Sequence, residues 1–211
     1  MNVKLTGIGV ILMLTVSACA SPKPNTLTET DLENAQNLAE DLGDVLVPTN
    51  PGDMPDNGTA TYTGGMATAP DVETGIIGEM EMTADFDAGT VSGSASNVNI
   101  LVDGNPDIES QMLTGSLDID GTITGTSMEA SMTGDLGGVI QGFSATFAAD
   151  MDMDGEFASS DPLGTESDVM AGLITGDIDV IVSGSLEDTM TLEAGDAGFV
   201  VCTVECDTLV P

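Results

Sequence analysis

The strongest constraint on the fold is an alternation of apolar and polar residues with period two, which begins after Gly58. In residues 79–86, apolar side chains at the even positions alternate with polar or acidic side chains at the odd positions. The same alternation recurs in residues 113–120, 143–153, 174–180 and 189–192, and turn-forming Gly, Asp, Asn and Pro separate these segments. Each segment is typical of a strand with one dry and one wet face. The pattern therefore predicts an all-β fold, a small antiparallel β-barrel or sandwich of about eight strands.

Small and flexible residues fill the expected inner face. Inward positions are often glycine or alanine, as at Gly93, Ala95, Gly115 and Gly176. Small inward residues let backbones approach closely, which favours a narrow, strongly coiled barrel. The chain has 13 Met but only five Phe, one Tyr and no Trp, so we expect methionine to fill the core. The alternation slips between Ala95 and Val98 and between Ile123 and Met128, and we interpret both slips as bulges.

The N-terminus resembles a bacterial lipoprotein signal. Lys4 precedes an apolar run over residues 5–16, and Val16-Ser17-Ala18-Cys19 matches a lipobox. The resemblance implies a signal peptide over residues 1–18, cleavage before Cys19, and acylation of the thiol and the new amino terminus of Cys19. The alternative is an ordinary cleaved signal beside a bystander cysteine. Ala20 replaces the Asp of an inner-membrane retention signal, which favours the bacterial outer membrane, with the periplasmic or the cell-surface side left open.

Residues 19–57 are expected to form a lipidated tether that contains one short amphipathic helix. Thr30 and Glu33 have capping-box spacing. Apolar residues follow at helical steps of three and four: Leu32, Ala35, Ala39, Leu42 and Leu46. The prolines and glycine of residues 48–57 end this helix, so we assign residues 58–211 to the barrel domain.

The charge of the chain excludes several classes of partner. It has 36 Asp and Glu against two Lys and Arg, no His, and a net charge of −34. No Lys, Arg or His occurs from Pro24 to Pro211, so the barrel has no cationic surface for nucleic acid or for anionic lipid. The only membrane contact that we expect is through the N-terminal lipid. The absence of His, Trp and a cationic group in the barrel also argues against an enzyme.

Four strand motifs rich in Gly and Thr follow one another along the chain: Gly58–Gly64, Ala84–Gly93, Gly121–Gly125 and Gly142–Phe157. In this order, they resemble strands of the barrel lobes of transferrin-binding protein B. The resemblance covers about residues 57–160 and implies a surface or outer-membrane lipoprotein with an eight-stranded barrel that binds a protein or another ligand. The chain has one barrel rather than two lobes, and Asp150–Asp154 replaces the family's Ala-Glu element. We therefore expect the fold and the location, but not transferrin binding.

One acidic run has the spacing of a calcium loop. Oxygen-bearing residues at the spacing of an EF-hand loop are Asp150, Asp152, Asp154, Glu156 and Asp161, with Gly155 at the sixth position. Calcium is thus the one cofactor that the sequence suggests. The alternative is a strand whose alternate Asp side chains face water.

Cys202 and Cys206 are the remaining thiols. A turn between them would bring them within bonding distance, and an exported compartment favours a disulfide. The hypothesis for function is an acidic lipoprotein that displays a non-catalytic barrel to an unknown protein or small ligand. The alternative is a structural envelope lipoprotein whose acidic surface holds cations.

Overall fold

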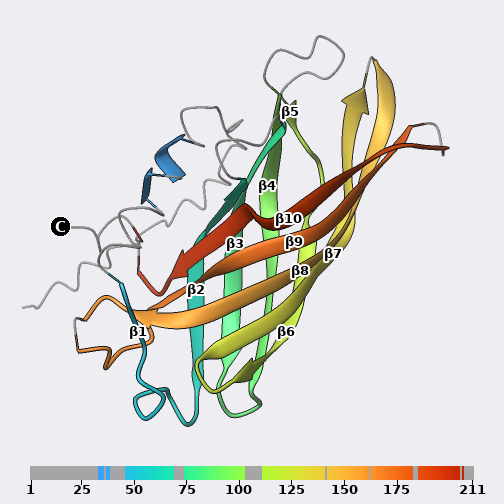
Figure 1. Ribbon diagram of the computed structural model, residues 1–211. Coiled ribbons are helices and arrows are strands. Elements are labelled where there is room, and N and C mark those ends of the chain that lie inside the picture. Colours follow the sequence, from blue (N-terminus) through green and yellow to red (C-terminus); the bar gives the residue numbers. More distant parts are fainter. Residues whose placement is uncertain are drawn as a thin grey trace, which may run out of the picture.

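The structure is a computed structural model. It describes residues 33–35, 37–38, 46–68, 74–102, 111–140, 142–161, 163–182, 185–204 and 206. This part of the chain is almost entirely β-structure (Figure 1). The strands are β1 Val47–Pro48, β2 Thr59–Thr68, β3 Thr74–Asp85, β4 Thr90–Val102, β5 Gln111–Met112, β6 Leu117–Thr124, β7 Ser127–Ile140, β8 Phe143–Ser159, β9 Val169–Val182 and β10 Ser185–Cys202.

Eight long strands close into an antiparallel barrel. The order of hydrogen-bonded neighbours is β8-β7-β6-β4-β3-β2-β10-β9, and β9 pairs back with β8. Strands that follow each other along the chain are therefore neighbours in space, apart from β5, a short strand beside β4. The short β1 pairs with the end of β8. The all-β prediction is confirmed, and a closed barrel takes the place of the sandwich alternative.

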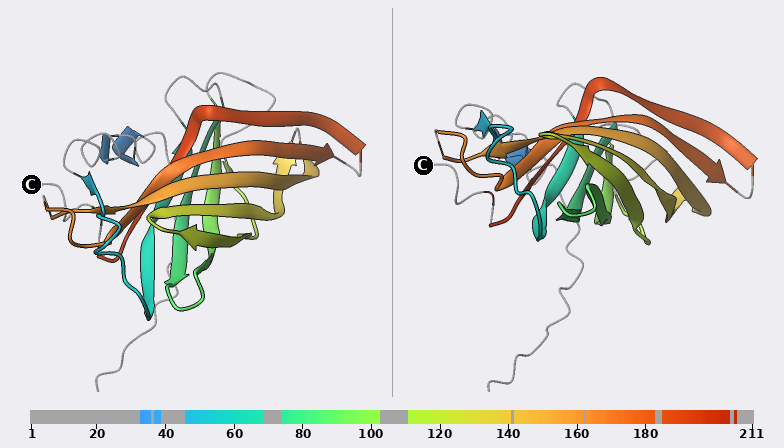
Figure 2. Two further views of the ribbon diagram at one scale, coloured as in Figure 1. Left: turned by 60° about the horizontal axis from the view of Figure 1, so that its bottom comes forward. Right: turned by 90° about the horizontal axis from the view of Figure 1, so that it is seen from below.

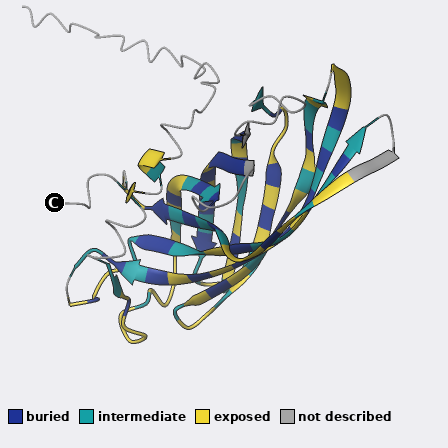
Figure 3. Cartoon of the chain, turned by 45° about the horizontal axis from the view of Figure 1, so that its top comes forward, coloured by how far each residue is buried: buried dark blue, intermediate teal, exposed yellow. Residues whose placement is uncertain are grey.

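The interior of the barrel is apolar, as the alternation predicts. One row of directly opposed residues crosses all eight strands on the inner face: Tyr62, Met82, Gly93, Ile119, Met132, Met151, Gly176 and Leu192. Five of these positions carry Met or Gly, which confirms methionine as the core filler and small residues as inward ones. Figure 3 shows the resulting bands of buried and exposed residues along each strand.

The outer face carries short hydroxyl side chains and carboxylates. The neighbouring register row contains Thr63, Glu81, Ser94, Asp118, Thr133, Asp150, Asp177 and Thr191. Seven of these eight residues, all but Ser94, are exposed in a face that contains no basic residue. The charge of the chain thus lies on the outside of a dry barrel.

Three local predictions are settled by the strand register. The first slip is a bulge, because the pairing shifts between Ile77↔Asn99 and Glu79↔Ser96, and Asn97 adopts φ 49°. The interpretation of the second slip as a bulge is wrong, because Ile123 and Met128 face each other across the tight β6–β7 turn. The strand expected over residues 113–120 begins only at Leu117, since Gly115, with φ 115°, lies in the irregular link after β5.

Of the segment for which an amphipathic helix is expected, residues 33–35 and 37–38 have helical backbone. Glu33, Asn34 and Asn37 are exposed, whereas Ala35 and Leu38 are partly covered. Within the described residues, no helix is long and apolar enough to cross a bilayer.

Candidate functional site

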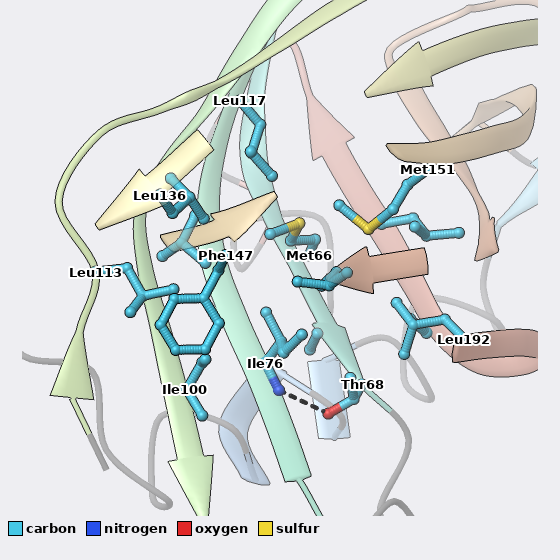
Figure 4. Close-up of a pocket in the computed structure, with 15 residues that line it drawn as sticks. Met66, Thr68, Ile76, Ile100, Leu113, Leu117, Leu136, Phe147, Met151 and Leu192 are labelled. Atoms are coloured by element: carbon cyan, nitrogen blue, oxygen red, sulfur yellow. Dashed lines mark hydrogen bonds between the residues drawn. The ribbon is translucent and has the colours of Figure 1, made fainter. Parts of the chain in front are cut away.

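An apolar cavity occupies the end of the barrel where β2 ends and β3 begins, which we call the open end. Fifteen residues from all eight long strands and the link after β5 line it: Met66, Ala67, Thr68, Ile76, Val98, Ile100, Leu113, Leu117, Leu136, Phe147, Met151, Ile174, Ile178, Leu192 and Ala197. Figure 4 shows their side chains converging from opposite walls. The cavity has a volume of about 20 Å³, which is about the space of one water molecule.

The lining of the cavity defines the chemistry that it accepts. Thr68 is its one polar side chain, and the Thr68 hydroxyl accepts a hydrogen bond of 3.0 Å from the backbone N–H of Ile76. All other lining side chains are aliphatic, aromatic or thioether. A polar ligand group would lose its water without gaining partners, so only an apolar group fits. Met66 and Met151 are unbranched side chains that can adapt to such a group.

Hydrogen bonds connect the strands on one side of the cavity, whereas strand pairing ends on the other side. On the first side, Thr114 exchanges two backbone hydrogen bonds of 2.7 and 2.8 Å with Gly137 of β7. The Gln111 side chain adds two more to the backbone of Val139, at 2.7 and 2.8 Å. On the other side, the pairing between β2 and β10 stops at Thr68↔Ala197. The barrel is therefore sealed beside β7 and opens between β2 and β10.

The opposite end of the barrel, which we call the closed end, is filled and covered. Phe157 packs edge-on against Tyr62 with ring centroids 6.0 Å apart, and against Phe86 at 5.8 Å. The Tyr62 hydroxyl donates a 2.6 Å hydrogen bond to the carbonyl of Ser167. Burial raises the pKa of Tyr62 to about 12, and the nearby Asp168 carboxylate adds to the rise, whereas the Ser167 side chain acts in the opposite direction. Tyr62 and Phe157 are both fully buried, so aromatic side chains fill this end of the barrel.

Residues 46–53, which we call the strap, fasten the N-terminal side of the chain to the closed end. The N–H of Thr49 donates to the carbonyl of Phe157 at 3.1 Å, and the Thr49 hydroxyl donates to the carbonyl of Glu166 at 2.7 Å. The Asn50 amide donates to the carbonyl of Leu163 at 2.8 Å. The strap lies inside the segment assigned to the tether from the sequence, so the barrel's contacts begin before residue 58. The chain thus reaches the barrel at the end opposite the cavity.

The predicted calcium ligands are not brought together. Asp150, Asp152, Asp154 and Glu156 lie on the exposed face of β8, which continues as a strand past Gly155 to Ser159. Alternate residues of a strand are about 6.6 Å apart, too far for side chains that point in parallel to share one ion. Asp161 instead accepts a hydrogen bond from the Thr165 hydroxyl in the β8–β9 loop. Within the described ranges, no three His, Cys, Asp or Glu side chains could hold a metal ion.

The two C-terminal cysteines are joined. Cys202 and Cys206 form a disulfide with Cα atoms 5.4 Å apart, as the sequence leads one to expect. Cys202 is fully buried at the end of β10, so the bond holds Cys206 beside the end of this strand. Cys19, the predicted site of lipidation, lies outside the described residues.

Sequence reasoning did not single out the cavity. Period-two alternation predicts that Met66, Leu136 and Leu192 face inward, but it predicts the same for the other core residues and so does not distinguish those that line the cavity. The signal that could have been used is the unequal strand length: β10 has 18 residues and β2 has 10. A long strand beside a short one must lose its neighbour at one end, and the barrel opens there.

No known protein family matches the chain, and no curated protein sequence matches it significantly.

Proposed function

We propose that this protein is an acidic lipoprotein, anchored in the bacterial outer membrane through Cys19, whose barrel binds a ligand or a partner protein without catalysis. The proposal takes up the resemblance to the barrel lobes of transferrin-binding protein B, with a partner that is not transferrin. The observation that carries it is the placement of the two barrel ends. The strap leads from the lipid tether to the closed end, whereas the apolar cavity lies at the open end.

This placement suits a receptor. A lipid on Cys19 would hold the closed end toward the membrane, and the cavity would then face away from the bilayer toward incoming ligands. Acyl chains at one terminus hold a soluble domain on a membrane stably when two or more are present. The acidic outer face keeps the barrel away from anionic lipid headgroups and attracts basic partners.

The anchor is tested by expressing the wild-type chain and Cys19→Ala in a Gram-negative host. Mass spectrometry of the wild type is expected to show an N-terminal acylated cysteine at position 19, with the protein in the outer-membrane fraction. Cys19→Ala is expected to lose both the acyl groups and the membrane association. An unacylated wild-type N-terminus would contradict the proposal.

Binding is tested by capture on the purified lipoprotein, with an unrelated protein of equal negative charge as the control for ion exchange. One protein or small apolar molecule retained by the barrel and not by the control supports a receptor. Retention of the same basic proteins by both would contradict it.

The second candidate function is a structural envelope lipoprotein with a cation-holding coat. Its supporting observation is that like charges face each other across strands, with Asp150 opposite Asp177 and Glu129 opposite Asp154. Diffuse cations would relieve such repulsion without a built site. This function predicts uptake of many divalent cations per chain with equal preference and no specific partner in the capture experiment.

A further inference from the structure

β10 has a long edge that is paired on one side only. Among the described strands, Ser185–Leu192 pairs with β9 alone, and pairing with β2 starts only at Ala197. Figure 2 shows this part of β10 as the rim of the sheet in both views. Along such an edge, alternate residues direct their backbone N–H and C=O groups away from the sheet. The edge therefore offers a ladder of hydrogen-bonding groups to an incoming strand.

The two strand edges at the open end, those of β7 and β10, differ in how their backbone groups are hydrogen-bonded. Beyond Thr133, β7 also loses its strand neighbour β6. There, the backbone groups of Gly137 and Val139 are bonded by Thr114 and Gln111. Along Asp188–Leu192, the N–H of Thr189 donates a 2.9 Å hydrogen bond to the side chain of the preceding Asp188, and no described residue of another loop or strand besides β9 bonds this edge. A partner strand that displaces the Asp188 carboxylate can therefore reach the edge of β10.

The inner and outer faces of this edge differ in chemistry. Met190 and Leu192 lie opposite Ile178 and Gly176 on the inner face, and Leu192 lines the cavity. On the outer face, Thr189 donates a 2.7 Å hydrogen bond to Asp179, and Thr191 donates one of 2.6 Å to Asp177. A strand laid against β10 would have the apolar cavity on one face and carboxylates on the other.

We propose that the β10 edge, Asp188–Leu192, together with the adjoining cavity, binds an extended protein segment in which basic and apolar residues alternate. This inference rests on the binding function proposed above and names its class of partner. The backbone of the segment pairs with the edge, in the mode known as strand addition. Its apolar side chains point toward Leu192 and the cavity.

The basic side chains are selected by the carboxylates of β9. A residue that lies beside Thr191 on an added strand is two strand spacings from Asp177, about 10 Å. Thr189 and Thr191 are short, so a lysine can lie across them and reach the carboxylates of Asp179 and Asp177. Asp188 and Glu193, both exposed, add negative charge at the two ends of the edge. An acidic segment would be repelled.

The same charges disfavour a second copy of this chain as the occupant. An edge-to-edge dimer would bring two β10 strands together, each with Asp188 and Glu193 and each beside Asp177 and Asp179. Like charges across neighbouring strands are destabilising. A basic partner removes this repulsion, whereas a second copy doubles it.

The probe for the test is a fluorescent synthetic peptide of about eight residues in which lysine and valine alternate, a length typical of a strand. The full lipoprotein is purified in detergent, and binding is followed by fluorescence anisotropy. The lysine–valine peptide is expected to bind, and the glutamate–valine peptide is not. Hydrogen exchange at Asp188–Leu192 is expected to slow when the peptide is present. Binding without slower exchange at this edge would overturn the proposal, as would a dimer that forms through the edge in the absence of peptide.

Two N-methylated peptides separate strand addition from simple charge attraction. One is methylated on the lysine nitrogens of the backbone and the other on the valine nitrogens. In a paired strand only one of these sets faces β10, so one peptide is expected to lose more than about tenfold in affinity while the other binds nearly as before. Equal binding of both, or loss of both, contradicts strand pairing.

The carboxylates are tested with a matched pair of double variants. Asp177→Asn/Asp179→Asn is expected to weaken the lysine–valine peptide by about threefold to tenfold. The control, Asp118→Asn/Asp120→Asn, removes the same charge from the outer face of β6 and is expected to leave binding nearly unchanged. Equal effects of the two would reduce the interaction to net charge and overturn the proposal.

The proposal and the wider binding function fail in different ways. If a natural partner is captured by the wild type and equally by Asp177→Asn/Asp179→Asn, and this partner does not slow exchange at the edge, the barrel is a receptor but β10 is not its binding edge. If nothing is retained over the charge control, the receptor function itself falls.

Discussion

The ring of Phe199 on β10 lies over Gly155 on β8, although β9 runs between the two strands. A Cβ atom on Gly155 would stand 2.7 Å from Cζ of Phe199. Gly172 of β9 is directly opposite both residues, so the ring of Phe199 packs over two adjacent glycines, Gly172 and Gly155. The scarce aromatic residues of this chain thus depend on glycines to be accommodated inside a narrow barrel.

Gly172→Ala is expected to lower the free energy of unfolding by about 1–3 kcal/mol, because the new methyl group overpacks the core. Its Cβ would lie 2.0 Å from the carbonyl oxygen of Asp154 and 2.5 Å from Cα of Gly155, and neither backbone atom can move alone. Urea denaturation followed by circular dichroism measures the change. Gly52→Ala is the control, since nothing lies within 4 Å of its added Cβ, and it is expected to stay within about 0.5 kcal/mol of the wild type. A wild-type midpoint for Gly172→Ala would contradict the close packing.

The general fold could be predicted from the sequence because a strand's alternation is a local property. The alternation around Met80 and Met82 predicts that both side chains face inward, whatever strands lie beside them. The tight turns predict that strands consecutive in sequence are neighbours in the sheet. The slip after Ala95 was interpreted correctly because a bulge also disturbs the local period. The slip at Ile123 was not, because a two-residue hairpin turn interrupts the same period in the same way.

The site could not be predicted in the same way, because it depends on where strands stop pairing. Neither Leu192 nor Thr68 differs in pattern from residues deep in the core. Their importance comes from the end of the β2–β10 pairing beside them. The calcium prediction was misled by spacing alone: the positions of Asp150, Asp152 and Asp154 are those of a loop motif, but also those of one face of a strand.

Stability is expected to fall as the pH rises from about 10 to about 12, with Tyr62 as the cause. Its folded pKa is raised from 10.0 to about 12, so in this window the unfolded chain loses the phenolic proton while the folded chain keeps it. Unfolding is thereby favoured by up to about 2–3 kcal/mol. Tyr62 is the single tyrosine in a chain without Trp, so ultraviolet titration of the phenolate reports on this residue alone.

Tyr62→Phe serves as the control for this titration. It removes the hydrogen bond to the Ser167 carbonyl and is expected to be less stable at neutral pH. Its stability should then fall less steeply than that of the wild type above about pH 10. A phenolate that titrates at the ordinary value in the folded wild type would show that Tyr62 is not buried.

Removal of the disulfide is expected to lower the free energy of unfolding by about 2 kcal/mol, the chain-entropy value for a loop this short. The bond joins Cys202 to Cys206, four residues further on. Denaturation of the wild type with and without a thiol reductant measures the loss. Cys202→Ala/Cys206→Ala is expected to resemble the reduced wild type and to be indifferent to reductant. A wild type that is equally indifferent would mean that the bond is absent from the purified protein.

Relief of the repulsion between Asp150 and Asp177 is expected to stabilise the barrel. The two exposed carboxylates lie directly opposite each other on β8 and β9, and no basic residue from Pro24 onward can neutralise them. Asp150→Asn is therefore expected to raise the free energy of unfolding by about 0.5 kcal/mol at low ionic strength. The gain should disappear at about 1 M salt, where the Debye length is about 3 Å.

Asp120→Asn provides the matched comparison, because it lowers the net charge by the same amount while Asp120 has Ser92 and Ser131 as its cross-strand neighbours. Its stabilising effect at low salt is expected to be smaller than that of Asp150→Asn, since only the general repulsion is relieved. Denaturation midpoints of both variants at about 0.02 M and about 1 M salt decide the matter. Equal gains for the two variants would show that the acidic face acts through its total charge alone, and that the opposition of Asp150 and Asp177 carries no energy of its own.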